Sequence, residues 1–232
     1  YCPENEPVGD LMIDIAEMYC GGTADRDFSD RVSQEEYLRG INWAYEHFTV
    51  LTFDETPTVE DVLEAFTDYM QVSPIDGVSL DPLNDLKAGE KQSKYDYYYD
   101  ALSNIRRFIK KNKVAFYLVV HPGTAANRRR NDDGSRPAPN MSDVEFGSMF
   151  GNRADNFIVF HRNPQSENWN MTEIHIQKVK FQKLVGVPTP ETRPIALFYH
   201  YATRRFRYLN ENGSPIDPIA LVDSKVKPSN VF

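Results

Sequence analysis

The sequence predicts an α/β protein with a mainly parallel sheet, helices on both of its faces, and antiparallel strands toward the C-terminus. In the first 120 residues, segments with helical apolar spacing alternate with short apolar runs, an order typical of parallel strands and crossover helices. After residue 150, four strand-like segments follow one another without a comparable helical pattern. The length of 232 residues suits one domain with a substantial core, and we expect residues 1–232 to form it.

Four helices are predicted in the first half of the chain. Residues 7–20 carry apolar side chains at helical spacing. Ser33 and Glu36 match a capping box that begins a second helix, and Thr58 is a suitable cap for a third. A fourth helix, at about 95–112, ends in lysines, where cations suit the helix dipole.

Strand-like segments complete the expected order. In the first half they lie at 48–53, 76–81 and 114–120. The run Val114–Val120 is continuously apolar, which is typical of a central parallel strand covered on both faces. In the second half, strands are expected at about 156–161, 173–181, 195–201 and 204–209.

Composition excludes several classes of protein. Apolar residues make up 41% and aromatic residues 12%, which argues against disorder, and no apolar run is long enough for a transmembrane helix. The two cysteines, Cys2 and Cys20, form neither a disulfide framework nor a zinc site, which favours a reducing cytoplasm. Three histidines lack metal-ligand spacing and are interpreted as structural or surface residues: His161, His175 and His200.

The charge is unevenly distributed along the chain. Residues 1–100 hold 23 acidic and 6 basic residues (net −17), whereas residues 101–232 hold 20 basic and 11 acidic residues (net +9). An acidic protein of this kind can still present a basic face to a polyanion. The alternative is that the acidic half only keeps the protein soluble.

Three polar residues follow predicted strands. Glu4 follows a short strand remnant in YCPEN, Asp81 ends the strand in GVSLD, and His121 ends the strand in VVHP. Ligands of doubly wound sheets bind beyond the carboxyl ends of the strands, so this edge is a candidate site for a metal–phosphate complex. Alternatives stay open, because Asp-Pro commonly begins a turn, Glu4 could cap a helix, and His121 could simply end a strand.

A basic loop follows His121 directly. Flexible cationic loops contact phosphates without reading sequence, and this one carries Arg128, Arg129, Arg130 and Arg136. Two aspartates in the same loop dilute its charge, so a solvated loop without a partner is the alternative.

A phosphate-binding P-loop is missing from the sequence. Its signature, G-x-x-x-x-G-K-[ST], provides backbone N–H groups and a lysine that hold phosphates. The 232 residues contain no Gly-Lys pair followed by Ser or Thr. If Asp81 supports magnesium, its P-loop partner is expected before Tyr1 or on another chain.

The chain resembles the RecA-like motor domain of hexameric replicative DNA helicases, the DnaB/Twinkle/phage primase-helicase family. The matching stretches are YCPEN (1–5), GVSLDPLNDL (77–86), VVHPGT (119–124), DVEFGSMFGNRADNFIVFHRN (143–163), IHIQKVKFQKLVG (174–186) and FYHYATRRF (198–206). The resemblance implies a RecA-like P-loop NTPase core whose first strand and P-loop are missing from these residues.

The resemblance also implies roles for the strand-end residues. Glu4 corresponds to the catalytic glutamate that activates the attacking water. Asp81 corresponds to the Walker B acid that holds Mg²⁺ through water, and His121 to the γ-phosphate sensor. The arginine loop would line the central channel and grip single-stranded DNA.

Further site residues are implied by the same resemblance. Gly147 and Ser148 would border a second DNA-contacting segment. Arg162, together with an aromatic ring at Phe198 or Tyr199, would pack on the nucleotide base.

The chain departs from the family at one position. The family has Lys-x-Arg where this sequence has Lys178-Val179-Lys180, and its arginine acts on the ATP of the neighbouring subunit. Lysine is a point charge without the planar fork of arginine. Either Lys180 serves as the finger, or Arg204 or Arg205 does, or activation between subunits is weak.

The resemblance implies an ATP-driven DNA helicase motor subunit that translocates on single-stranded DNA and unwinds duplex during replication. It further implies ATP or another NTP, Mg²⁺, a hexameric ring, a primase domain or protein as partner, no membrane, and the cytoplasm of a bacterial cell or phage-infected host. The isolated chain would be inactive without its P-loop. The alternative is a non-catalytic module that binds DNA or oligomerises. A third candidate class is a metal-dependent nuclease that uses Asp81 and His121. It would need a second and a third carboxylate at suitable spacing, and the sequence lacks them.

Overall fold

The computed structural model describes residues 1–4, 7–23, 31–88 and 93–219. They fall into two compact units, one of residues 1–11, 48–128 and 140–154, the other of residues 12–47, 129–139 and 155–232. The helices are α1 (Val8–Cys20), α2 (Gln34–His47), α3 (Val59–Val72), α4 (Lys94–Asn112), α5 (Thr124–Arg128), α6 (Gly147–Arg153) and α7 (Gln182–Val185). The strands are β1 (Gly77–Leu80), β2 (Ala115–Leu118), β3 (Asn156–His161), β4 (Met171–Val179), β5 (Ile195–His200), β6 (Arg205–Leu209) and β7 (Pro215–Ile216).

The first unit is built around the parallel pair β1–β2. The register runs from Gly77 opposite Ala115 to Leu80 opposite Leu118. The ladder continues past the strands, because the Val119 N–H donates to the Leu80 carbonyl at 2.9 Å. Strand, helix and parallel strand therefore follow one another as the sequence predicts.

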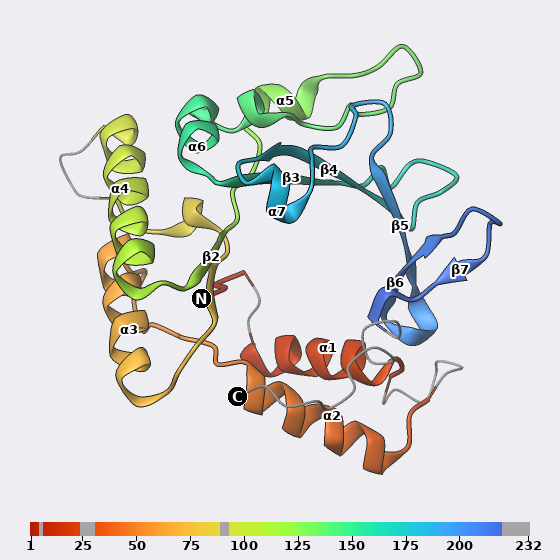
Figure 1. The fold of residues 1–232 in the computed structure, drawn as a ribbon, viewed down its shortest axis with the longest axis horizontal. Coiled ribbons are helices and arrows are strands. Elements are labelled where there is room, and N and C mark those ends of the chain that lie inside the picture. The colour runs from red at the N-terminus through yellow and green to blue at the C-terminus, as the bar shows by residue number, and fades with distance from the viewer. Residues whose placement is uncertain (5–6, 24–30, 89–92, 220–232) are drawn as a thin grey trace. The chain divides into compact units, whose positions relative to one another are not determined.

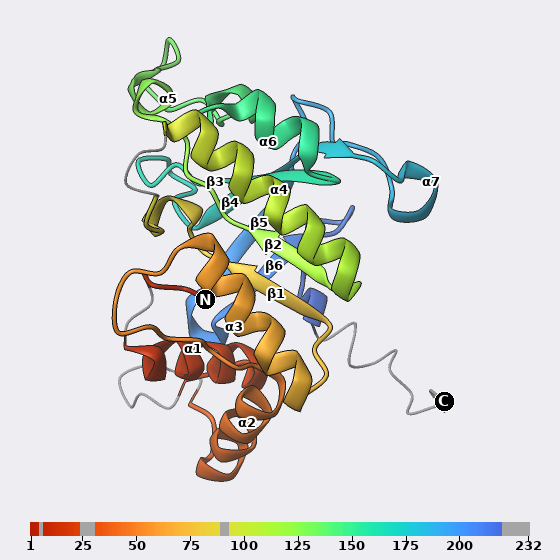
Figure 2. The same cartoon turned by 90° about the vertical axis from the view of Figure 1, so that its left-hand side faces the viewer.

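Helices α3 and α4 lie side by side and cover one face of this pair (Figures 1 and 2). Phe66 of α3 and Phe108 of α4 are 6% and 7% exposed, and both rings contact Phe116 of β2 at centroid distances of 6.4 and 6.0 Å. Such packed aromatic side chains contribute a large share of core stability. The amphipathic spacing of the two helices thus defines the core of this unit.

The predicted capping box at Ser33 and the predicted cap at Thr58 both form, and Thr58 turns out to be part of a capping box as well. The Asp61 N–H donates to Thr58 Oγ1 at 3.2 Å while the Thr58 N–H donates to the Asp61 carboxylate at 2.8 Å. The Glu36 N–H and Ser33 make the same reciprocal pair at 3.2 and 3.0 Å. Hydrogen bonds from the Ser33 hydroxyl and N–H lower the pKa of the Glu36 carboxyl group, and those from the Thr58 N–H and hydroxyl lower the pKa of the Asp61 carboxyl group, because they favour the charged form.

The second unit holds an antiparallel sheet in the order β3-β4-β5-β6-β7. Paired residues share one face of an antiparallel sheet, so Phe160, Ile174 and Ile195 form a row across three strands. Exposed fractions of 69% for Phe160 and 43% for Ile195 leave the ends of this row accessible.

Three strand predictions are corrected by the structure. The prediction of a mainly parallel sheet is wrong, because β1–β2 is the one parallel strand pair in the described part of the chain. Residues 48–53 form no strand there, because β-branched residues favour extended backbone but a ladder also needs a partner strand. The run Val114–Val120 narrows to β2 and is covered on one face only, since Tyr117 is 66% exposed.

All four strands predicted in the second half are present; the expectation at 156–161 matches β3, and the other three have shifted ends. The expectation at 173–181 becomes β4, which ends at Val179, so Lys180 lies just beyond it. The short elements α5, α6, α7 and β7 were not anticipated, because each is too short to show a periodic pattern. Within the described ranges, no helix combines the length and apolar character needed to cross a membrane.

Candidate functional site

The ends of β1 and β2 form the candidate site of the first unit. Because Leu80 and Leu118 are register partners, Asp81 and His121 follow the same edge of the pair. Asp81 is half-buried, and its peptide bond to Pro82 is cis. The parallel pairing therefore produces the shared strand edge that the sequence predicted.

The first residues of the chain run beside β1. The Tyr1 amino group donates to the Ser79 carbonyl at 2.8 Å, and the Asp81 N–H donates to the Tyr1 carbonyl at 3.0 Å. This is the hydrogen-bonding pattern of a parallel neighbour, which agrees with the expected strand remnant. The segment brings Glu4 to the same end of β1 as Asp81.

Glu4 and His121 are brought into contact. His121 Nε2 lies 3.5 Å from Glu4 Oε1, with the two side chains 53% and 51% exposed. A carboxylate and an imidazole this close can hold or pass a proton, and their exposure leaves them open to a substrate. No cluster of three or more acidic, histidine or cysteine side chains suited to a metal occurs among the residues described.

Lys180 lies at the end of β4 in the second unit. Its ammonium group pairs with Asp155 Oδ1 at 2.5 Å, and the side chains are 44% and 55% exposed. The Lys180 N–H also donates to the Asp155 carbonyl at 2.9 Å. Lys178 lies opposite Phe157 on β3 and is half-buried.

Arg204 belongs to a buried polar cluster. Its Nε lies 3.2 Å from Glu17 Oε2, and Thr23 Oγ1 donates to Glu17 Oε1 at 2.6 Å. Glu17 is 5% and Thr23 0% exposed. A hydrogen bond with Tyr199, followed by the nearby Glu17 carboxylate, raises the pKa of Arg204. This guanidinium therefore serves the fold.

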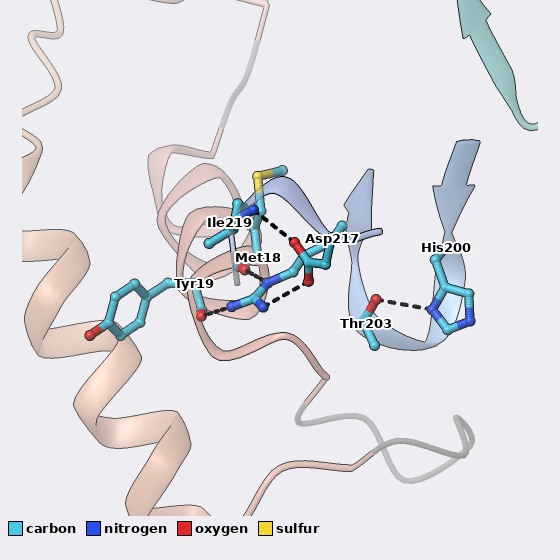
Figure 3. Close-up of polar contacts among 7 residues, drawn as sticks. Met18, Tyr19, His200, Thr203, Asp217 and Ile219 are labelled. Atoms are coloured by element: carbon cyan, nitrogen blue, oxygen red, sulfur yellow. Dashed lines mark hydrogen bonds and ion pairs between the residues drawn. The ribbon is translucent and has the colours of Figure 1, made fainter. Parts of the chain in front are cut away.

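Arg205 connects the end of α1 to Asp217 near the end of the described residues. Figure 3 shows Met18, Tyr19 and Asp217 at this connection. Its guanidinium donates to the Met18 carbonyl at 2.7 Å, to the Tyr19 carbonyl, and to Asp217 Oδ2 at 3.0 Å. The two carbonyls belong to the last turn of α1, which has no basic residue of its own. Asp217 in turn accepts the Ile219 N–H at 2.9 Å.

The expected base-packing residues lie on β3 and β5. Arg162 is exposed just after β3. Phe198 and Tyr199 are half-buried on β5 and, as consecutive strand residues, lie on opposite faces. Tyr199 already packs against the Tyr201 and Phe206 rings, with centroids at 4.7 and 5.2 Å. Two of the three histidines interpreted as structural have polar contacts: the His175 ring lies 3.1 Å from the Glu173 carboxylate, and the His200 ring lies 2.9 Å from the Thr203 hydroxyl (Figure 3).

The arginine loop combines a short helix with a tight turn. Its four arginines, at 128, 129, 130 and 136, are all exposed. Between them, the Asn131 N–H donates to the Ser135 carbonyl at 2.9 Å, and Gly134 has φ +80°. Ser135 donates twice to the Asp133 carboxylate, which lowers the pKa of Asp133. Asp133, one of the two aspartates that lower the net positive charge of the loop, is thus hydrogen-bonded within the turn.

Gly147 and Ser148 begin α6 and differ in exposure. Gly147 is buried, and a Cβ there would lie 2.0 Å from the Met141 carbonyl oxygen, so this position requires glycine for packing. Ser148 is exposed and is the one of the pair whose side chain can meet a ligand. Sequence reasoning missed Glu17, Thr23 and Asp217, because an acid or hydroxyl in a helix or loop usually indicates a solvated position.

No family model matches the chain. It is 29% identical over 163 residues to the Twinkle homolog protein, chloroplastic/mitochondrial, of Arabidopsis thaliana, a match covering 67% of this chain and 22% of that protein. The chain therefore spans about a fifth of the curated relative.

Solved structures show the fold. The ATPase domain of G40P matches with a TM-score of 0.65 and 16% identity over 87% of this chain and 71% of that chain. A DnaB-like replicative helicase, solved to show its interactions with primase, matches with a TM-score of 0.64 and 15% identity over 88% of this chain and 48% of that chain. The sequence match is thus to a Twinkle homolog, and the structural matches show the fold of helicase ATPase domains.

Proposed function

We propose that residues 1–232 form one motor domain of an ATP-driven replicative DNA helicase that translocates on single-stranded DNA and unwinds duplex. The contact between Glu4 and His121, at the strand edge that also carries Asp81, is the observation that carries this proposal. A water-activating base, a magnesium-supporting acid and a polar sensor are the groups that nucleotide hydrolysis needs at one edge.

Each of these side chains has a separate task in the proposed reaction. Glu4 accepts a proton from the attacking water, because its carboxylate is exposed and within 3.5 Å of an imidazole that can share the charge. Asp81 would hold Mg²⁺ through water, and the ion would neutralise developing charge on the phosphates. His121 senses the γ-phosphate and begins the segment that leads into the arginine loop.

The arginine loop is the proposed DNA contact. Its four exposed arginines and the exposed Ser148 suit phosphates of single-stranded DNA, whatever the base sequence. Binding should therefore weaken as salt concentration rises. Arg162 with Phe198 or Tyr199 is proposed to hold the base of the nucleotide.

The P-loop is proposed to come from polypeptide outside these 232 residues, because no G-x-x-x-x-G-K-[ST] occurs among them. Subunits would assemble as a hexameric ring in which Lys178 and Lys180 face the nucleotide of the next subunit. A primase domain or protein is the proposed partner, and the cytoplasm of a bacterial cell or phage-infected host the proposed location.

The test is nucleotide turnover by the protein that carries this chain together with a P-loop, with and without single-stranded DNA. We expect DNA-stimulated hydrolysis that Glu4→Gln lowers by about 10²–10⁴-fold, the usual contribution of a general base. DNA affinity should survive this substitution. Equal turnover by the wild type and by Glu4→Gln would show that Glu4 is not a catalytic residue.

The absent P-loop signature favours a second candidate, a module that binds DNA or oligomerises without hydrolysing ATP. The same assay separates the two. Hydrolysis that depends on Glu4 establishes the motor, whereas DNA binding without hydrolysis in the P-loop-containing protein establishes the module.

A further inference from the structure

The arginine loop is hydrogen-bonded to the strand that carries the proposed finger. Gln177 of β4 donates from Nε2 to the Pro139 carbonyl at 3.0 Å, across 38 residues of sequence. Both residues belong to the second unit, and both are half-buried. Pro139 lies three residues after Arg136, and Lys178 follows Gln177 directly. A partly buried hydrogen bond therefore joins the proposed DNA contact to the proposed finger strand.

Stiff segments connect the arginines of the loop with Pro139. The Asn131 N–H donates to the Ser135 carbonyl and the Gly134 N–H donates to the Asn131 carbonyl, each at 2.9 Å, so the turn is closed. The sequence Arg-Pro-Ala-Pro follows at 136–139. Each proline fixes its own φ and favours an extended conformation for the residue before it. A change in the position of the arginines is therefore passed on to the Pro139 carbonyl.

Gln177 lies at an irregularity in β4. Phe157 and Ile158 are consecutive on β3, yet they lie opposite Lys178 and Ile176. Across this step β4 has one more residue than β3, and that residue is Gln177. Such β-bulges bend a strand, re-aim side chains and are frequent next to active sites. The arginine loop thus holds β4 at the point where the strand departs from a regular ladder.

Both lysines considered for the finger lie within three residues of Gln177. Lys178 precedes and Lys180 follows Val179, the last residue of β4, which is 9% exposed. The Lys180 ammonium group pairs with the Asp155 carboxylate at 2.5 Å and lies 5.0 Å from the centre of the Phe181 ring. Exposed contacts of these kinds are weak. A small shift of β4 is therefore sufficient to redirect the ammonium group.

We propose that Gln177 is a positioning residue that couples DNA binding at the arginine loop to the lysines at the end of β4. The inference rests on the proposed motor function and identifies a residue through which DNA regulates hydrolysis. When DNA phosphates fix the loop arginines, the Pro139 carbonyl fixes the Gln177 amide, and β4 then directs Lys178 and Lys180. Without DNA the loop is held less firmly, and so are both lysines.

Nucleotide turnover by the protein that carries this chain together with a P-loop tests the coupling. Gln177→Met removes the amide donor without adding a charge, and Gln177→Glu places an acceptor against the Pro139 carbonyl. Gln182→Glu is the matched control, because Gln182 is exposed on α7 and undergoes the same change of charge. We expect both Gln177 variants to lower the ratio of DNA-stimulated to DNA-free turnover by at least about fivefold, the lower end of typical coupling between two sites. The control should keep the wild-type ratio.

This ratio distinguishes coupling from a purely structural role of Gln177. A hydrogen bond that only supported the fold would, when lost, lower the melting midpoint and reduce both rates by the same factor. An unchanged ratio in Gln177→Met would therefore overturn the inference. Affinity for a labelled oligothymidine, measured by fluorescence anisotropy, should be the same in every variant, because all loop arginines are retained. A ratio that falls only because DNA no longer binds would also count against the coupling.

Chemical labelling of the two lysines tests the same coupling without hydrolysis. The rate at which an amine-reactive reagent acylates Lys178 and Lys180, followed by peptide mass spectrometry, should change when oligothymidine binds the wild type. It should not respond to oligothymidine in Gln177→Met, and a wild type whose labelling ignores DNA would refute the coupling. If labelling responds through Gln177 but hydrolysis is absent, the motor proposal fails alone. If DNA stimulates hydrolysis equally in the wild type and Gln177→Met, the coupling inference fails alone.

Discussion

Replacing Arg205 by Met should destabilise the protein, whereas loss of a finger residue would impair hydrolysis alone. Arg205 and Asp217 have side chains only 12% and 18% exposed. Methionine is also unbranched, but it leaves the Asp217 carboxylate and the carbonyls of Met18 and Tyr19 without the hydrogen bonds that Arg205 donates. Removing one partner of a buried charge pair costs about 3–5 kcal/mol, and the residual exposure places this case near the lower value, about 3 kcal/mol.

The loss can be read from thermal and urea unfolding followed by circular dichroism. For a protein of this size, about 3 kcal/mol corresponds to a fall in the melting midpoint of about 6–12 °C. Arg207→Met is the matched control on the same strand, because Arg207 has no side-chain hydrogen bond among the residues described. A free energy of unfolding within about 0.5 kcal/mol of the wild type would refute the reasoning. Normal stability with lost hydrolysis would restore Arg205 as a finger candidate.

Three further predictions concern the core and the proposed finger. Burial raises the pKa of Tyr97, so the folded state keeps this proton longer than the unfolded state, and the free energy of unfolding should fall as pH rises above about 10, near the ordinary tyrosine pKa. Because the buried Tyr97 hydroxyl has no hydrogen-bond partner among the described residues, Tyr97→Phe should reduce this alkaline loss and raise stability at pH 7 by up to about 1 kcal/mol, as urea unfolding at pH 7 and above about pH 10 would show. Leu80→Ala should cost about 2–5 kcal/mol, because Leu80 is 1% exposed and leaves a cavity, whereas a smaller loss would mean that the site collapses. Lys180→Ala should lower DNA-stimulated turnover by about 10³-fold and Lys180→Arg should retain it, and equal turnover in all three proteins would exclude the lysine finger.

Local signals predicted the fold well where they came from neighbouring residues. The capping boxes at Ser33 and Thr58 and the ends of α3 and α4 depend on side chains within one turn. The run Val114–Val120 was misjudged, because an apolar run shows that a segment is extended but not how many faces are covered. How many faces of β2 are covered depends on α3 and α4, which pack on one face. This tertiary packing cannot be predicted from a short stretch of sequence.

The geometry of the candidate site was also only partly predictable from the sequence. Asp81 and His121 could be paired from sequence, because parallel strands end at one edge and the register of β1–β2 is unshifted. The contact of Glu4 with His121 depends on the first residues running beside β1, a tertiary pairing for which YCPEN gave only a weak signal. Arg204 and Arg205 also contact α1, and the Arg205 contact with Met18 spans 187 residues of sequence, so their structural role could not be predicted from the motif itself.

The ion pairs of Arg204 and Arg205 distinguish among the basic residues considered for the finger. Moving Arg204 to a neighbouring phosphate would leave Glu17, only 5% exposed, without its cation, at a cost of about 3–5 kcal/mol. Moving Arg205 carries a similar cost through Asp217. Lys180 instead pairs with Asp155 at an exposed strand end, where an ion pair contributes about 0–1 kcal/mol and can be exchanged for a phosphate. The difference of several kcal/mol favours Lys180 as the residue that reaches the next subunit, with a single charge in place of a fork.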